Sequence, residues 1–152
     1  MLEEQTEDES IITSTVEDYL ETILVLCEEK GEAQITEIAK SLTPSRSKPS
    51  VTEFVTKLRR HGLVHYKKYG TVTLTKKGRK IAQKIKKRHD YLSSFLQMLG
   101  VSEDQSEEDA CIMEHNLSKE TGSRFEAFVR FLQKKEQEDV LKRFTKYLEQ
   151  TQ

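Results

Sequence analysis

The segment CIMEHNLS, residues 111–118, holds three side chains that can bind a transition-metal ion. If this segment is helical, spacings of three and four residues place Cys111, Glu114 and His115 on one face. A thiolate, a carboxylate and an imidazole on one face form a donor set for a transition metal. The alternative is that Cys111 is a small buried apolar residue and that Glu114 and His115 form an ordinary surface pair. Other parts of the sequence are needed to choose between the two.

Two other expected helices carry candidate ligands. Asp18 and Glu21 lie three residues apart in the first helix, and His89 lies in a long helix in the middle of the chain. Each also has an ordinary interpretation, because Asp18 could cap its helix, Glu21 could be a solvated charge and His89 could end a basic run. A metal site requires that three separate helices meet, which spacing along the sequence does not establish.

Charge is strongly segregated along the chain, although the net charge is only −1. Residues 1–32 contain 11 acidic residues, and residues 101–121 contain 7. Residues 57–88, in contrast, contain 13 Lys or Arg and no acidic residue. A short basic run is usually a solvated helix face, but a basic stretch of this length is typical of a surface that binds nucleic acid.

Apolar residues at helical spacing predict helices over residues 15–30, 35–42 and 49–62. Alternating apolar residues then predict two short strands within residues 63–75, joined by a basic turn. Three helices followed by a two-stranded hairpin predict a winged helix-turn-helix, in which the third helix enters the major groove of DNA. A small helical domain with a hairpin and no DNA partner is the alternative.

Capping residues are expected to set the bounds of these helices. Thr15, with Asp18 three residues later, resembles an N-terminal cap, and Gly31 is a plausible C-terminal stop. Pro49 fits the first position of the third helix. Ser106 is the expected N-cap of the helix that holds Cys111.

The second half of the chain is predicted to be entirely helical, which makes the protein mainly α. Helices are expected over residues 76–99, 106–118 and 121–150, the last as one or two helices rich in phenylalanine. An aromatic stripe of this kind is expected to pack partly against a second copy, because two-fold operators require dimers. The expected divisions are a disordered N-terminus over 1–14, a winged helix-turn-helix over 15–75, and a helical dimerisation and metal-binding domain over 76–150.

Composition indicates a cytoplasmic protein. No apolar run approaches the roughly 20 residues of a membrane-spanning helix, so no membrane partner is expected. The acidic, polar start of the chain is unlike a secretory signal or a transit peptide. Two widely separated cysteines without a CxxC pattern fit a reducing compartment better than a disulfide framework.

The sequence resembles the metal-dependent repressors of the diphtheria-toxin-repressor and manganese-transport-regulator family. The matching segments run in the same order over residues 15–135. They are VEDYLETI, the helix-turn-helix ITEIAKSL…KPSVTEFVTKLRRHGLV, the wing YKKYGTVTLTKKGRKIA, and then RHDYLSSFLQMLGV and ACIMEHNLS. The length resembles the short manganese-regulator form, which lacks an additional SH3-like domain.

This resemblance implies a homodimer that binds double-stranded operator DNA when a divalent metal occupies a site between its domains. The positions that match the family's metal ligands are Asp18, Glu21, His89, Cys111, Glu114 and His115. Cys111 stands where the manganese type has a bridging glutamate and the iron type has a cysteine, whereas Asp18 stands where the iron type has a methionine. An ancillary site of the iron type would use His89, Ser93 and Glu107, and Ser93 there replaces a carboxylate ligand.

The implied donor set mixes hard and soft ligands. Carboxylates favour hard ions such as Mn²⁺, and a thiolate favours iron, cobalt or zinc. Manganese is expected first because hard donors outnumber the single thiolate, with Fe²⁺ and Zn²⁺ next, and no organic cofactor is expected. Cys111 also leaves the number of ions in each subunit open, since a carboxylate can bridge two metals.

The residues expected to contact DNA surround the third helix and the hairpin. Those expected around the bases are Ser47, Lys48, Pro49, Ser50, Thr52 and Lys57. Those expected at phosphates are Arg46, Arg59, Arg60, Lys67 and Lys68.

Two competing functions remain at this stage. A metallohydrolase could use Cys111, Glu114 and His115, but the sequence has no HExxH motif, no nucleophile turn and no obvious general base, so no enzymatic activity is expected. A winged-helix regulator that responds to an organic effector, without a metal, would explain the basic stretch. It would leave the six candidate metal ligands unexplained.

Overall fold

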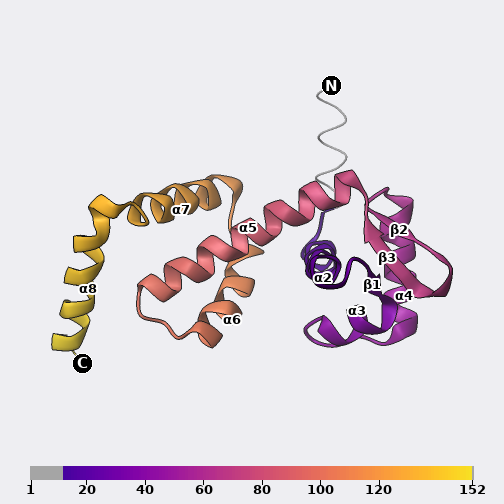
Figure 1. Cartoon of the computed structure of the whole chain (residues 1–152), viewed down its shortest axis with the longest axis horizontal. Helices are drawn as coiled ribbons and strands as arrows, with labels where there is room; N and C mark the ends of the chain where they lie inside the picture. Colours follow the sequence, from indigo (N-terminus) through magenta and orange to yellow (C-terminus); the bar gives the residue numbers. More distant parts are fainter. Residues whose placement is uncertain (1–11, 152) are drawn as a thin grey trace, which may run out of the picture. The chain divides into compact units, whose positions relative to one another are not determined.

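The computed structural model describes residues 12–151, and of Lys68 only the backbone. The chain is mainly helical and divides into two compact units, Met1–Ile85 and Lys86–Gln152, which are described separately (Figure 1). Disorder was expected over residues 1–14, and residues 1–11 of that range lie outside the described part. Within residues 12–151, none of the helices combines the length and apolar character needed to cross a bilayer.

The first unit begins with α2 (Ser14–Lys30), whose apolar positions recur at helical spacing and are buried. Thr13, rather than Thr15, caps this helix, because its side chain accepts a hydrogen bond from Val16 N at 3.4 Å. The helix ends at Gly31, as expected. Gly31 adopts a φ of 84°, a left-handed conformation that costs glycine little.

The helix-turn-helix consists of α3 (Ile35–Ser41) and α4 (Lys48–Arg60). Ser47 caps α4 by accepting a hydrogen bond from Ser50 N at 3.4 Å, so the helix begins one residue before Pro49. The inward face of α4 carries Val51, Val55 and Leu58, all buried in the core of this unit. The three predicted helices of this unit are therefore confirmed, with bounds shifted by one or two residues.

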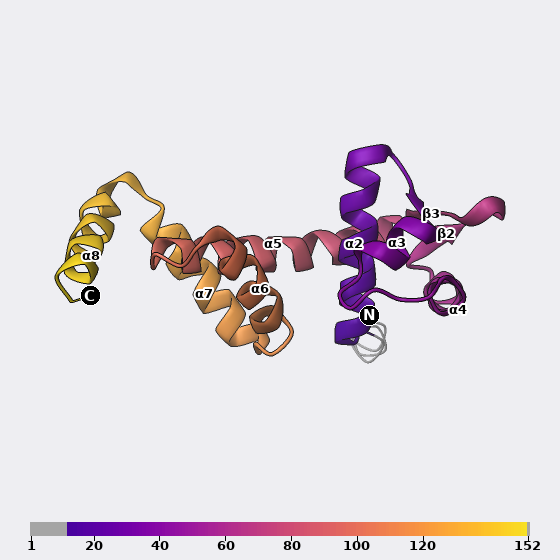
Figure 2. The same ribbon diagram turned by 90° about the horizontal axis from the view of Figure 1, so that it is seen from below.

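The sheet has three strands, in the order β1–β3–β2. The predicted hairpin is formed by β2 (Val64–Tyr66) and β3 (Thr71–Leu74), which run antiparallel. The additional strand β1 (Ala33–Gln34) pairs with the other edge of β3. Sequence patterning missed β1 because two residues are too few to show alternation. Figure 2 shows the turn between β2 and β3 extending beyond the rest of this unit.

The helix α5 (Lys76–Met98) begins beside residues 61–63, which connect α4 to β2, because Thr75 hydrogen-bonds to Gly62 and Leu63. Thr75 anchors this start, because its hydroxyl donates to Gly62 O at 2.7 Å and accepts from Gly78 N at 3.0 Å. Ala82 and Ile85 extend the contact, since both belong to the core of the first unit. The beginning of α5 therefore packs as part of the first unit.

The second unit contains the rest of α5 together with α6 (Glu103–Glu114), α7 (Lys119–Leu132) and α8 (Glu138–Thr151). Phe95 of α5 packs edge-on against Phe125 of α7, with ring centroids 5.3 Å apart. The aromatic stripe is nevertheless only partly covered in the single chain, since Phe128 and Phe131 are exposed and α8 has no buried residue among those described.

The bounds of α6 differ from the prediction. Ser102, not Ser106, is the N-cap, and it accepts a hydrogen bond from Gln105 N at 3.4 Å. Ser106 is instead fully buried one turn into the helix. The helix also ends at Glu114 rather than at residue 118, because Ser118 caps the following helix α7.

Gly78 marks a close approach that generates a testable prediction. A Cβ atom at this position would lie 1.9 Å from the carbonyl oxygen of Leu63, which is backbone and cannot move aside cheaply. We expect Gly78→Ala to lower the free energy of unfolding by about 1–3 kcal/mol, although alanine is the better helix former.

Urea unfolding of Gly78→Ala, beside the exposed substitution Gln83→Ala on the same helix, measures this effect. The Gln83→Ala variant should remain within about 0.5 kcal/mol of the wild type. Equal midpoints for the two variants would contradict the proposed clash.

Candidate functional site

The last turn of α6 brings together the three side chains that the sequence singled out. One potential ligand atom from each of Cys111, Glu114 and His115 lies within 4.8 Å of the others. Cys111 is exposed and His115 is half-buried at the C-cap of the helix, whereas Glu114 is buried with 1% of its surface accessible. The predicted spacing therefore produces a cluster with one face open to solvent and one carboxylate inside.

The buried carboxylate of Glu114 is the unusual feature of this cluster. Neither of its oxygens accepts a hydrogen bond from the described residues. Two imidazole nitrogens face it, with His115 Nε2 at 3.4 Å from Oε1 and His89 Nδ1 at 3.5 Å from Oε2. A buried carboxylate that is not hydrogen-bonded costs several kcal/mol unless a cation compensates it. Cys111, Glu114 and His115 together supply a thiol, a carboxylate and an imidazole, which is a donor set that fits a divalent transition metal, and His89 faces the same carboxylate.

The other ring nitrogen of His89 is engaged by α6. His89 Nε2 lies 2.8 Å from Glu107 Oε2, and the Ser93 hydroxyl donates to Glu107 Oε1 at 2.5 Å. The hydrogen bond from Ser93, followed by that from His89, lowers the pKa of Glu107 below the ordinary value for a glutamate. Glu107 is thus an acceptor shared by two residues of α5.

The two candidate ligands of the first unit, Asp18 and Glu21, lie on α2. They are three residues apart, on adjacent turns of one helix face, and both are half-buried. Their participation in one site with the α6 cluster stays a prediction.

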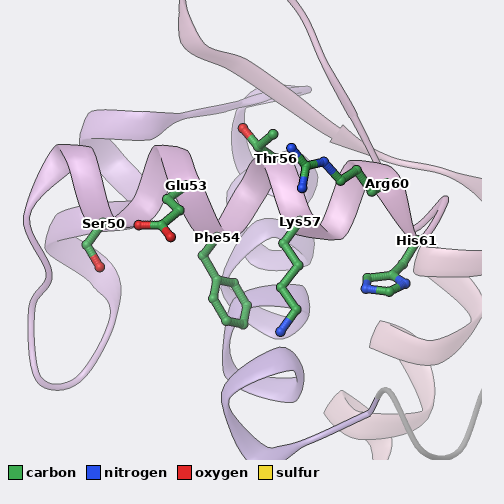
Figure 3. A pocket seen from close by; sticks show the side chains of 7 residues that line it. All are labelled: Ser50, Glu53, Phe54, Thr56, Lys57, Arg60 and His61. Carbon is green, nitrogen blue, oxygen red and sulfur yellow. The ribbon is translucent and has the colours of Figure 1, made fainter.

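The candidate nucleic-acid interface centres on the outer face of α4. Figure 3 shows a hollow along this helix, and Lys57 extends beside the ring of Phe54, with its Nζ 5.9 Å from the ring centroid. Phe54 is held from below by Tyr19 of α2, whose ring stacks on it at 4.3 Å. The residues that line the hollow are Ser50, Glu53, Phe54, Thr56, Lys57, Arg60 and His61.

Most of the side chains expected to contact DNA are exposed. Thr52 is half-buried, and its hydroxyl donates to Lys48 O at 2.9 Å. Arg59 is exposed but does not line the hollow, and the side chain of Lys68 lies outside the described residues. The exposed members are Arg46, Ser47, Lys48, Pro49, Ser50, Lys57, Arg59, Arg60 and Lys67.

Sequence reasoning missed one residue on the outer face of α4 and one in the turn between β2 and β3. Glu53 lies between Ser50 and Lys57 on the same face of α4, and spacings of three and four residues could have revealed it. Tyr69 has a positive φ of 77° and is 91% exposed in the turn between β2 and β3. No spacing rule identifies a residue of that kind, because its exposure depends on the conformation of the turn.

Two known domain families match the chain. The "Iron dependent repressor, N-terminal DNA binding domain" matches residues 12–72. The "Iron dependent repressor, metal binding and dimerisation domain" matches residues 75–149. The two matches follow one another and together cover nearly all of the described residues.

Curated relatives and solved structures agree with this assignment. The "HTH-type transcriptional regulator MntR" of Geobacillus kaustophilus (strain HTA426) is 41% identical over 124 residues, which are 82% of this chain and 86% of that protein. The protein of the same name from Bacillus pumilus (strain SAFR-032) is 39% identical over 140 residues, covering 91% and 96%.

Among solved structures, a "Manganese-dependent transcriptional repressor complex with manganese" is 30% identical with a TM-score of 0.66, over 76% of this chain and 53% of that one. The manganese regulator SloR is 32% identical with a TM-score of 0.64, over 76% and 54%. The chain thus spans about half the length of these two proteins. The family match, the relatives and the fold confirm the resemblance seen in the sequence: this chain belongs to the iron-dependent repressor family of metal-dependent, DNA-binding transcriptional repressors.

Proposed function

We propose that this chain is a manganese-responsive repressor, which acts in the cytoplasm as a homodimer on the operators of metal-transport genes. The observation that carries this proposal is the buried carboxylate of Glu114, which two imidazoles face without a hydrogen bond. The names of the relatives support manganese, and the family match supports both the dimer and the operator DNA.

Four residues of the second unit would hold the metal, and two of the first unit would complete its ligand set. When bound, the metal supplies positive charge that compensates Glu114 and orients the ligands. His89, Cys111, Glu114 and His115 act from α5 and α6, and α2 contributes its two carboxylates. Ligands drawn from both domains would couple metal binding to the arrangement that binds an operator. Such a coupling is reciprocal and typically amounts to about 1–3 kcal/mol.

The choice of metal depends on the balance between Cys111 and the carboxylates. The exposed thiol of Cys111 stands at the edge of the cluster, whereas Glu114 is enclosed by it. Oxygen and imidazole donors suit manganese, and the sulfur adds affinity for softer ions such as Fe²⁺ and Zn²⁺. We therefore propose manganese as the physiological ion, with iron and zinc as competitors.

The first unit supplies the proposed DNA contacts. The outer face of α4 would enter the major groove, where Ser50 and Lys57 can donate to base edges and Glu53 can accept from the amino group of cytosine. The turn between β2 and β3 would reach the neighbouring phosphates through Lys67. The remaining alternatives, a metallohydrolase and a metal-free regulator with an organic effector, have no observation in the described residues that favours them.

The first prediction of this proposal concerns Glu114. We expect Glu114→Gln to abolish most of the metal-dependent gain in operator affinity, which should be about 5–150-fold in the wild type. Fluorescence anisotropy of labelled operator DNA, in chelator and in Mn²⁺ at one salt concentration, measures this gain.

Glu108→Gln is the matched control, since it removes the same charge from an exposed position of α6. Thermal unfolding in chelator verifies folding, and there Glu114→Gln should be as stable as the wild type or more so, because a buried charge is removed. A full manganese response in Glu114→Gln would rule out the proposed site.

The second prediction concerns metal selectivity. Replacing the thiol in Cys111→Glu should shift the ratio of the dissociation constants for Zn²⁺ and Mn²⁺ towards manganese by about tenfold, equivalent to about 1.4 kcal/mol. Competition with a metal indicator dye measures both constants. Cys111→Ser separates the loss of sulfur from the gain of a carboxylate, and an unchanged ratio in both variants would show that Cys111 is not a ligand.

The third prediction concerns phosphate contacts. Lys67→Ala should lower the affinity for operator DNA and for unrelated DNA by similar factors. It should also reduce the slope of log K against log salt concentration by about 0.9. The exposed Lys134 of the second unit provides the control Lys134→Ala, which should leave the slope unchanged. A loss of affinity for the operator alone, with unchanged affinity for unrelated DNA, would instead assign Lys67 to base recognition.

A further inference from the structure

A chain of hydrogen bonds connects α5 and α6 beside the candidate metal ligands. His89, Ser93 and Gln97 lie at intervals of four residues on one face of α5. Gln97 Nε2 donates to Ser93 Oγ at 3.2 Å, and Ser93 Oγ donates to Glu107 Oε1 at 2.5 Å. The other oxygen of Glu107 lies 2.8 Å from His89 Nε2. Ser93 is buried at 3% exposure, so this network is fixed from the inside of the unit.

The contact with Glu107 favours a proton on Nε2 of His89. An ionised carboxylate only accepts hydrogen bonds, so the contact with Glu107 requires a hydrogen on Nε2. In the neutral ring, Nδ1 then keeps its lone pair. Nδ1 is the nitrogen that faces Glu114, at 3.5 Å from Oε2. A metal-bound histidine commonly donates its other N–H to a carboxylate in this way, which fixes the tautomer and the orientation of the ring.

We propose that Glu107 is a positioning residue that holds His89 as its Nε2–H tautomer, with Nδ1 directed into the metal centre, and that Ser93 holds Glu107 in place. This inference rests on the proposed function, because the orientation of Nδ1 matters only if His89 is a ligand. The family resemblance implies instead that His89, Ser93 and Glu107 form an incomplete ancillary metal site. The hydrogen bond from the Ser93 hydroxyl occupies one oxygen of Glu107, and His89 occupies the other, so both oxygens have a partner within the protein.

The exposure of the two carboxylates also separates their roles. Glu114 is enclosed and accepts no hydrogen bond from the described residues, whereas the side chain of Glu107 is 54% exposed and accepts two. Because solvent and two hydrogen-bond donors already stabilise the charge of Glu107, a bound metal is not required to compensate it. The same charge is well suited to orient an imidazole, because a charge-assisted hydrogen bond is short and directional.

The test compares Glu107→Ala and Glu107→Gln with Glu108→Ala, which removes a neighbouring exposed charge from the same helix. The full-length protein is labelled with ¹⁵N at histidine and kept metal-free in chelator, at a pH well above the ordinary pKa of imidazole. Ring ¹⁵N–¹H correlation spectra report the tautomer of His89. Titration of the chelator-free protein with Mn²⁺ gives the dissociation constant and the number of ions bound per subunit.

We expect the wild type and Glu108→Ala to show His89 as the Nε2–H tautomer. Glu107→Ala should show a mixture of tautomers and bind Mn²⁺ about 10–100-fold more weakly, with the same number of ions per subunit. Glu107→Gln should recover most of the affinity, because its amide oxygen can still accept from Nε2–H and its amino group can donate to Ser93.

Several results would overturn the inference. Unchanged manganese affinity in Glu107→Ala, or an unchanged tautomer, would show that Glu107 does not position His89. A smaller number of bound ions in Glu107→Ala, without recovery in Glu107→Gln, would make Glu107 a direct ligand instead. If the wild type itself bound no manganese, the proposed function would fail together with this inference. If the wild type bound manganese and Glu107→Ala bound it with the same affinity, only this inference would be contradicted.

Discussion

The burial of one carboxylate without a hydrogen bond is the constraint on which the second unit depends. Glu114 faces His89 of α5 from the last turn of α6, and a carboxylate buried without a hydrogen bond is costly unless positive charge compensates it. Two imidazole nitrogens lie 3.4 and 3.5 Å from the oxygens of Glu114, and these distances are too long for strong hydrogen bonds. One imidazole therefore faces each oxygen of Glu114, which is the arrangement that supports the proposed metal site.

Much of this architecture was predictable because it depends on local periodicity. Helical spacing located all but the exact ends of α2, α4 and α5, and alternation located the hairpin. The cluster of Cys111, Glu114 and His115 was predictable for the same reason, since residues three and four apart must be neighbours on a helix. Family resemblance added the two expected ligands in α2, which periodicity alone does not provide.

What escaped prediction depends on contacts between distant residues. The pairing of β1 with β3, the burial of Ser106 and the contact of Glu107 with Ser93 all join segments that are separated in the sequence. Caps were also misplaced, because Thr13 and Thr15, or Ser102 and Ser106, are equivalent by composition. Only the path of the chain before each helix decides which hydroxyl reaches an amide.

The position of α6's end has a consequence for the electrostatics of the cluster. The first turn carries Glu103 and Asp104, which complement the partial positive charge at a helix N-terminus, but the last turn carries no basic residue. The partial negative charge of the terminal carbonyl groups is thus concentrated where Cys111, Glu114 and His115 lie. A helix of this kind is ordinarily completed by lysine or arginine, with a gain of about 0.3–1 kcal/mol. Here a divalent cation held by the three side chains would complete the dipole as well as the ligand set.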